Sequence, residues 1–137
     1  MNAPDARLLL VDDSAPMRLV IRDVLADLGI TQVDEAADGI AGMERFRQAP
    51  YDLVITDWHM PRSTGLELLR RIRSAEYHRD TPVMMLTADQ NAARQLQALD
   101  EGANSFITKP WVMPMLVTEV LRLISARPDL HAHAPAP

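Results

Sequence analysis

The sequence predicts an α/β domain built on a parallel sheet of five strands with helices on both faces. Short runs typical of strands alternate with longer segments whose apolar residues recur at helical spacing, and this pair repeats five times. Parallel neighbours need crossover connections, which are right-handed, so the alternation indicates a doubly wound fold. Runs such as residues 53–56 lack the alternation of a half-exposed sheet and are typical of strands buried on both faces.

The strands of this predicted sheet are the short runs at residues 8–11, 32–36, 53–56, 82–86 and 105–108. The helices are the amphipathic segments that follow them, at residues 15–29, 39–49, 64–75, 91–102 and 115–126. In the first helix Val24 and Leu28 recur at helical spacing, and Gly29 supplies a stop. In the third helix Leu69 and Ile72 belong to the apolar stripe that we expect to face the sheet.

Length and composition predict one ordinary domain. A chain of 137 residues can bury roughly two-thirds of its unfolded surface and fold without disulfides or metals. We therefore expect a single domain over residues 1–126. Residues 127–137 are rich in Pro and Ala and have no apolar period, so we predict that this tail is disordered.

Charge and residue usage exclude several classes of function. A net charge of −5 provides no broad positive field for nucleic acid. The absence of cysteine excludes disulfides, zinc–thiolate sites and cysteine nucleophiles. The first residues lack a signal-type apolar segment, and no run approaches the ~18 apolar residues of a spanning helix. We expect a cytoplasmic monomer that binds neither nucleic acid nor membrane.

Polar residues follow four of the predicted strands, and in a parallel sheet such residues gather along one edge. Asp12 and Asp13 follow the first strand, Asp57 the third, Thr87 the fourth and Lys109 the fifth. Taken singly, each aspartate is equally well explained as a helix or turn cap, and the lysine as a surface residue. Their coincidence at one edge of the sheet is what favours a functional site.

The chemistry of this set points to phosphoryl transfer. Clustered carboxylates repel one another unless some are protonated or a cation lies among them, and oxygen ligands near a phosphate suit Mg²⁺. Thr87 and Lys109 add a hydroxyl and a positive charge, which suit phosphoryl oxygens. One carboxylate can then attack phosphorus to form an aspartyl phosphate. Asp57 is the best candidate, because it stands alone after its strand while Asp12 and Asp13 can share the metal.

Four motifs in this order resemble those of the receiver domains of two-component response regulators, namely LLLVDDS, VITDWHMPRSTGLELLRRIR, PVMMLTA and GANSFITKP. The resemblance covers about residues 7–126 and is closest to the single-domain chemotaxis regulators. It implies a flavodoxin-like sheet with the strand order 2-1-3-4-5 and Asp57 as the phosphoacceptor. It also implies Mg²⁺ held by Asp13, Asp57 and the backbone carbonyl of His59, with Asp12 contacting the ion through water.

The resemblance further implies a switch formed by Thr87 and Phe106. In the family the hydroxyl turns toward the phosphoryl group, and the aromatic ring swings inward behind it. The Lys109–Pro110 peptide bond is expected to be cis, as in relatives with the same pair of residues.

Several positions depart from the family pattern. His59 and Asp89 stand two residues after the phosphoacceptor and the switch threonine, at positions that influence the lifetime of the phosphoryl group in relatives. Phe106 replaces the tyrosine of the best-known motility regulators. Ala92 and Glu119 stand where motor-binding relatives carry basic residues. We therefore expect a phosphoryl lifetime and a partner specificity of the chain's own.

The resemblance implies a stand-alone regulator, not an enzyme, that receives a phosphoryl group from a sensor histidine kinase and passes the signal through residues 91–126. The partner is a flagellar motor switch or another kinase or phosphotransferase, so a phosphorelay shuttle and a kinase-regulating adaptor are the alternatives. A phosphatase of the haloacid dehalogenase type also uses an aspartyl phosphate. That family has its nucleophile after the first strand and a second Asp two residues on, whereas here Asp57 follows the third strand and His59 comes two residues later.

Overall fold

The computed structural model describes residues 5–111 and 113–125, in which five parallel strands form one sheet in the order β2-β1-β3-β4-β5. The strands are β1 (Arg7–Val11), β2 (Gln32–Ala36), β3 (Leu53–Thr56), β4 (Val83–Thr87) and β5 (Ser105–Thr108). The helices are α1 (Ala15–Asp27), α2 (Gly39–Phe46), α3 (Gly65–Arg73), α4 (Ala92–Asp100) and α5 (Met113–Ser125). The predicted fold class and strand order are confirmed.

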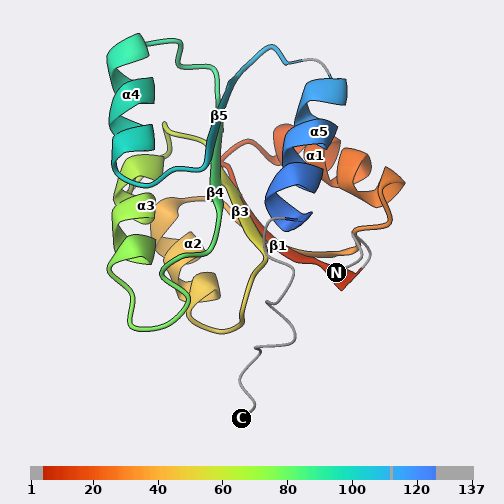
Figure 1. Ribbon diagram of the computed structural model, residues 1–137, viewed down its shortest axis with the longest axis horizontal. Helices are drawn as coiled ribbons and strands as arrows, with labels where there is room; N and C mark the ends of the chain where they lie inside the picture. The colour runs from red at the N-terminus through yellow and green to blue at the C-terminus, as the bar shows by residue number, and fades with distance from the viewer. Residues whose placement is uncertain (1–4, 112, 126–137) are drawn as a thin grey trace.

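The helices cover both faces of the sheet, with α1 and α5 on one face and α2, α3 and α4 on the other (Figure 1). Each face has its own apolar cluster. Leu10 of β1 packs in the cluster that contains Leu25 of α1 and Leu116 of α5. Its neighbour Leu9 belongs to the opposite cluster with Leu69 of α3. Adjacent residues of a strand point to opposite faces, so a strand covered on both sides needs an unbroken apolar run.

Local side-chain signals fix the ends of the helices. The hydroxyl of Ser14 accepts a hydrogen bond from the backbone of the first turn of α1. Thr64 and Glu67 form a capping box at the start of α3. Gly29 and Gly102 follow α1 and α4 with φ angles of 83° and 109°, a region that favours glycine. The prediction that Gly29 ends the first helix is therefore confirmed.

Element boundaries differ from the sequence-based ranges by one to three residues. The expected helices 15–29, 39–49, 64–75 and 91–102 each included residues of the turn that follows the helix. β4 begins one residue late, at Val83, and contains Thr87 as its last residue. α5 begins at Met113, before the expected start, since a proline such as Pro114 is tolerated in the first helical turn.

α4 has the fewest buried residues of the five described helices. Ala98 is its one buried residue, whereas Leu96 and Leu99 are 66% and 41% exposed. Side chains elsewhere must therefore contribute to its position.

None of the helices in residues 5–111 and 113–125 is long and apolar enough to cross a membrane. The predicted disordered tail, residues 127–137, lies outside the described residues. The proposed domain boundary at residue 126 stays a prediction.

Candidate functional site

The carboxyl ends of β1 and β3 bring three carboxylates together. One oxygen from each of Asp12, Asp13 and Asp57 lies within 4.8 Å of the others. Asp12 is buried, Asp57 is half-buried and Asp13 is exposed. The predicted acidic cluster therefore exists, and it opens toward solvent at one edge of the sheet.

Sheet hydrogen bonds fix the backbone that carries these groups. The Asp57 amide donates to the Val11 carbonyl at 3.0 Å, and the Asp12 amide donates to the Ala36 carbonyl at 3.1 Å. Asp57 Oδ1 also accepts from the Trp58 amide at 2.6 Å. The carboxylates are thus placed by the ends of buried strands, and their positions do not depend on a flexible loop.

Lys109 reaches into the same crevice from the end of β5. Its Nζ lies 3.2 Å from Asp12 Oδ2 and 3.5 Å from Asp57 Oδ2. Its amide donates to the Thr87 carbonyl at 2.7 Å, which ties the two strand ends together. The Lys109–Pro110 peptide bond is cis, as expected.

Burial and charge together set the electrostatics of the cluster. Burial raises the pKa of Asp12 above its ordinary value, and the nearby charge of Asp57 raises it further. The Ser14 amide and the Lys109 ammonium act in the opposite direction. A cation among the carboxylates would relieve the same repulsion, and a set of carboxylate oxygens without a thiol suits a hard ion. The residues therefore fit the predicted Mg²⁺.

The imidazole of His59 is turned to another partner. Its Nε2 lies 2.5 Å from Asp89 Oδ2, and the His59 side chain is 58% exposed. The ring nitrogen therefore contacts the Asp89 carboxylate and is not directed at the acidic cluster. The backbone carbonyl of His59 remains the group that we predict to face an ion.

The two predicted switch residues lie on neighbouring strands and share a face of the sheet. Phe106 of β5 pairs with Met85 of β4, and Thr87 follows two residues later on the same strand. Thr87 is 1% exposed, and its Oγ1 accepts a hydrogen bond from the Asp89 amide at 3.2 Å. The ring of Phe106 is half-buried against the apolar cluster on the side of α2, α3 and α4. Their roles stay predictions.

The sequence did not indicate the interaction of Arg94 with Asp89. Arg94 Nη1 lies 2.5 Å from Asp89 Oδ2. A positive side chain in the first turn of a helix opposes the helix dipole. The sequence signal that could have revealed this pair is an arginine in the first turn of a helix, five residues after an aspartate in the preceding loop.

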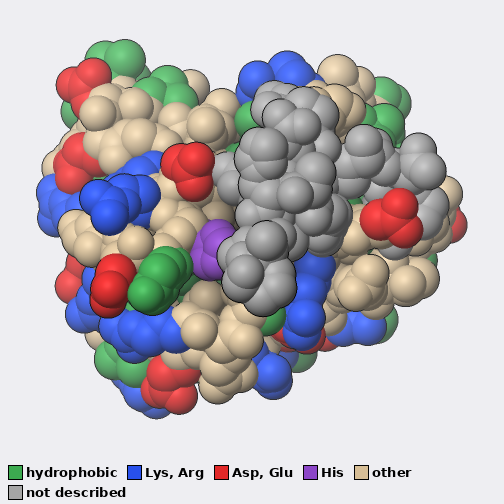
Figure 2. All heavy atoms as spheres, turned by 60° about the horizontal axis from the view of Figure 1, so that its bottom comes forward, with side chains coloured by type: hydrophobic (Ala, Val, Ile, Leu, Met, Phe, Trp, Pro, Cys, Tyr) green, Lys and Arg blue, Asp and Glu red, His purple; other side chains and the backbone are tan. Residues whose placement is uncertain are grey.

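A hollow lies at the end of the molecule opposite the acidic cluster, where α2 and α3 end. It has a volume of about 660 Å³, and its walls include Phe46, Arg71 and Tyr77. Figure 2 shows this end, where basic and acidic side chains are interspersed on the part drawn in colour. None of the predicted site residues lines this hollow.

The doubly wound sheet with an acidic crevice at the carboxyl ends of its strands has the architecture predicted for a receiver domain, and comparison with known proteins identifies its family. The model of the response regulator receiver domain matches residues 8–121. The chain belongs to this family. This assignment favours the receiver interpretation over the phosphatase interpretation.

Three relatives illustrate the similarity. Chemotaxis protein CheY of Pseudomonas aeruginosa is 34% identical over 117 residues, which cover 85% of this chain and 94% of the relative. The structure of chemotaxis response regulator CheY4 of Vibrio cholerae has a TM-score of 0.79 at 30% identity, covering 86% of this chain and 98% of that one. The receiver domain of sensor histidine kinase PA1611 from Pseudomonas aeruginosa also has a TM-score of 0.79 at 30% identity, covering 88% and 98%. That structure has a magnesium ion coordinated in its active-site cleft.

Proposed function

We propose that this chain is a stand-alone response regulator of chemotaxis or motility signalling that accepts a phosphoryl group on Asp57 from a sensor histidine kinase. One observation carries the proposal: the Asp57 carboxylate lies beside two further carboxylates and 3.5 Å from the Lys109 ammonium. Similarity to chemotaxis proteins of the CheY type supports the pathway. We place the protein in the cytoplasm as a monomer.

The proposed chemistry uses groups that the fold has already positioned. An oxygen of Asp57 forms a bond to phosphorus while the phosphorus–nitrogen bond of a donor phosphohistidine breaks, and the leaving imidazole takes up a proton from solvent. Lys109 Nζ attracts the phosphoryl oxygens. Mg²⁺, held by Asp13, Asp57 and the His59 carbonyl with Asp12 through water, would supply charge that offsets the phosphoryl oxygens.

The signal is proposed to leave the site through Thr87 and Phe106 toward the face formed by α4, β5 and α5. On this face Glu119 accepts hydrogen bonds from Ser105 and Arg122, at 2.8 and 2.9 Å. Motor-binding relatives carry a basic residue at the position of Glu119. The acidic residue here leaves two kinds of partner open, a motor switch and a kinase or phosphotransferase. The protein is not an enzyme in the usual sense, because the reactions it catalyses are its own phosphorylation and dephosphorylation.

Phosphorylation by a small donor tests the proposal without knowledge of the kinase. Wild-type protein incubated with acetyl phosphate and Mg²⁺ should acquire one phosphoryl group that is stable in acid and lost in base, as measured by intact mass. A chelator added beforehand should prevent the reaction. A protein that stays unlabelled under conditions that label a known receiver domain would contradict the proposal.

Binding of Mg²⁺ should be visible in the fluorescence of Trp58, whose amide bonds the carboxylate of Asp57 at 2.6 Å. The chain has two tryptophans, so the variant Trp111→Phe leaves Trp58 as the single reporter. Titration of this variant with Mg²⁺ should give a saturable change, because the ion redistributes charge beside a buried indole. Ca²⁺ and Na⁺ serve as controls. Absence of a fluorescence change, together with absence of heat by calorimetry, would rule out the metal site.

A further inference from the structure

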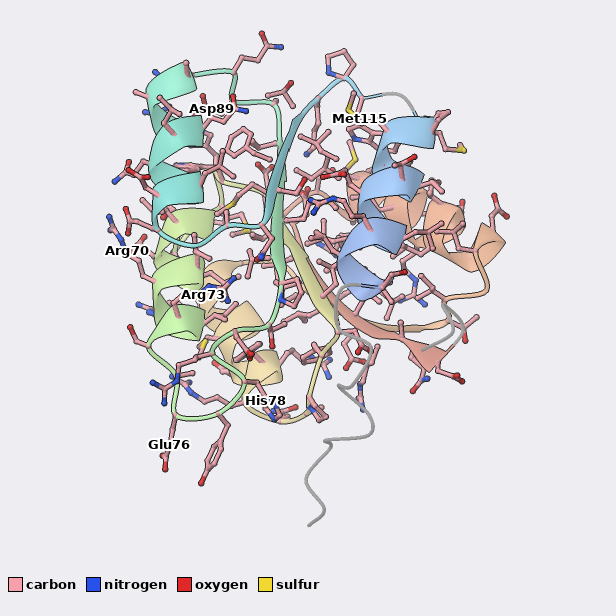
Figure 3. The ribbon with its side chains drawn as sticks, in the orientation of Figure 1. Arg70, Arg73, Glu76, His78, Asp89 and Met115 are labelled. Carbon is pink, nitrogen blue, oxygen red and sulfur yellow. The ribbon has the colours of Figure 1, made fainter. Side chains whose placement is uncertain are left out.

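The carboxylate of Asp89 is the centre of a hydrogen-bonded group beside the candidate site. Its side chain is 7% exposed, although it lies in the loop between β4 and α4. Oδ2 lies 2.5 Å from His59 Nε2 and 2.5 Å from Arg94 Nη1, and Oδ1 accepts from the Asn91 amide at 2.9 Å. In Figure 3 Asp89 lies at the upper end of α4, far from Glu76 and His78 at the opposite end of the molecule. One carboxylate therefore joins three parts of the chain.

These contacts connect the loop that follows the phosphoacceptor with the loop that follows β4. His59 lies two residues after Asp57, in the loop that leaves β3, and β3 pairs with β4. The Asp89 amide donates to the hydroxyl of Thr87 at 3.2 Å. The bridge from His59 through Asp89 thus spans the two loops on the β4 side of Asp57.

The same carboxylate is tied to α4 by its first turn. Asn91 caps the helix by accepting from the Arg94 amide at 3.1 Å, and the Arg94 guanidinium returns to Asp89. Ala98, the one buried residue of α4, lies beyond the first turn, so this contact helps to hold the first turn in place.

The Asp89 carboxylate is the negatively charged centre of this group. It contacts the Asn91 amide, the His59 ring and the Arg94 guanidinium. Its charge would therefore oppose a phosphoryl group on Asp57 unless a cation stays beside it. Of the two side chains that contact Oδ2, arginine is the one that is always charged.

We propose that Arg94 is a positioning residue for the phosphoryl group: it neutralises the Asp89 carboxylate and holds it against His59, so that the two loops beside Asp57 stay joined. This inference rests on the proposed phosphorylation of Asp57. Arg94 does not touch the reacting atoms, and it acts through Asp89.

The step that Arg94 affects is the loss of phosphate by hydrolysis. A water oxygen forms a bond to phosphorus while the bond between phosphorus and the Asp57 oxygen breaks. The electron pair of that bond returns to the carboxylate, inorganic phosphate leaves and a proton passes to solvent. A joined pair of loops restricts the approach of water, so weakening the bridge accelerates this step.

The variant Arg94→Met tests the inference in the full chain. Protein labelled with acetyl phosphate and freed of donor should lose its phosphoryl group about two- to fivefold faster than wild type, the range expected for a half-exposed ion pair. Arg94→Lys restores the positive charge and should bring the rate back toward that of wild type. In the background of Asp89→Asn, Arg94→Met should have no further effect, because its route is then absent.

Arg70→Met is the matched control. Arg70 forms an ion pair of 2.5 Å with Glu101 at the other end of α4, and neither residue belongs to the acidic cluster. This variant should keep the wild-type rate, so an equal acceleration in it would overturn the inference. An unchanged or slower rate in Arg94→Met, or an undiminished effect in the Asp89→Asn background, would also overturn it. Wild-type protein that acquires no label would instead overturn the proposed function itself.

Discussion

The variant Asp57→Asn is expected to acquire no phosphoryl group under conditions that label the wild type fully. The side-chain amide of asparagine has nearly the same shape as the carboxylate. It keeps an oxygen that can accept the hydrogen bond that the Trp58 backbone amide donates to Asp57 Oδ1 at 2.6 Å in the wild type. It lacks the negative charge that makes a carboxylate a nucleophile. Intact mass before and after base treatment measures the stoichiometry, and circular dichroism shows whether the fold is kept.

Asp13→Ala provides the informative comparison, because it should fail for a different reason. Asp13 is exposed and is proposed to hold Mg²⁺ without attacking phosphorus. Raising the Mg²⁺ concentration should therefore restore part of the labelling in Asp13→Ala and none in Asp57→Asn. Label at equal stoichiometry in Asp57→Asn would show that another residue is the acceptor.

The central strands β1, β3 and β4 were predictable because burial on both faces leaves a strong signal in the sequence. β3 has the predicted range, residues 53–56, and all four of its residues are buried. Helix ends were less predictable, since capping depends on a few local bonds. α5 begins two residues before its expected start because Pro114 fits the first turn of a helix, and the pattern of apolar residues does not reveal this.

The acidic cluster was predictable from topology alone, because parallel strands deliver their following residues to one edge. The partners of Asp89 were not predictable. His59 and Arg94 are respectively 30 residues before and 5 residues after it, and an exposed histidine and a helical arginine have many possible contacts. Only the folded backbone, through the cap at Asn91, brings both side chains to one carboxylate oxygen.

Gly65 is the first residue of α3, and the structure gives the reason for a glycine at this position. A Cβ atom at this position would lie 2.1 Å from the carbonyl oxygen of Asp57. The Gly65 amide also donates to the Trp58 carbonyl at 2.8 Å, so the helix start presses against the backbone that carries the phosphoacceptor. That backbone is held in turn by the bond from the Asp57 amide to Val11.

Gly65→Ala is therefore expected to lower the free energy of unfolding by about 2 kcal/mol or more. Helix propensity alone would favour alanine by up to ~1 kcal/mol, so the sign depends on the overlap. Denaturant titration should show the loss, and labelling by acetyl phosphate should slow because the Asp57 carbonyl must move. Gly42→Ala is the control, since the nearest neighbours of its Cβ would be the side chains of Val11 and Leu68, at 3.1 Å and beyond, and not a backbone atom. The control should stay within about 1 kcal/mol of wild type, the size of the propensity gain. Equal unfolding midpoints for Gly65→Ala and wild type would show that the end of β3 yields easily, and the rigidity assigned here to the backbone of Asp57 would then be wrong.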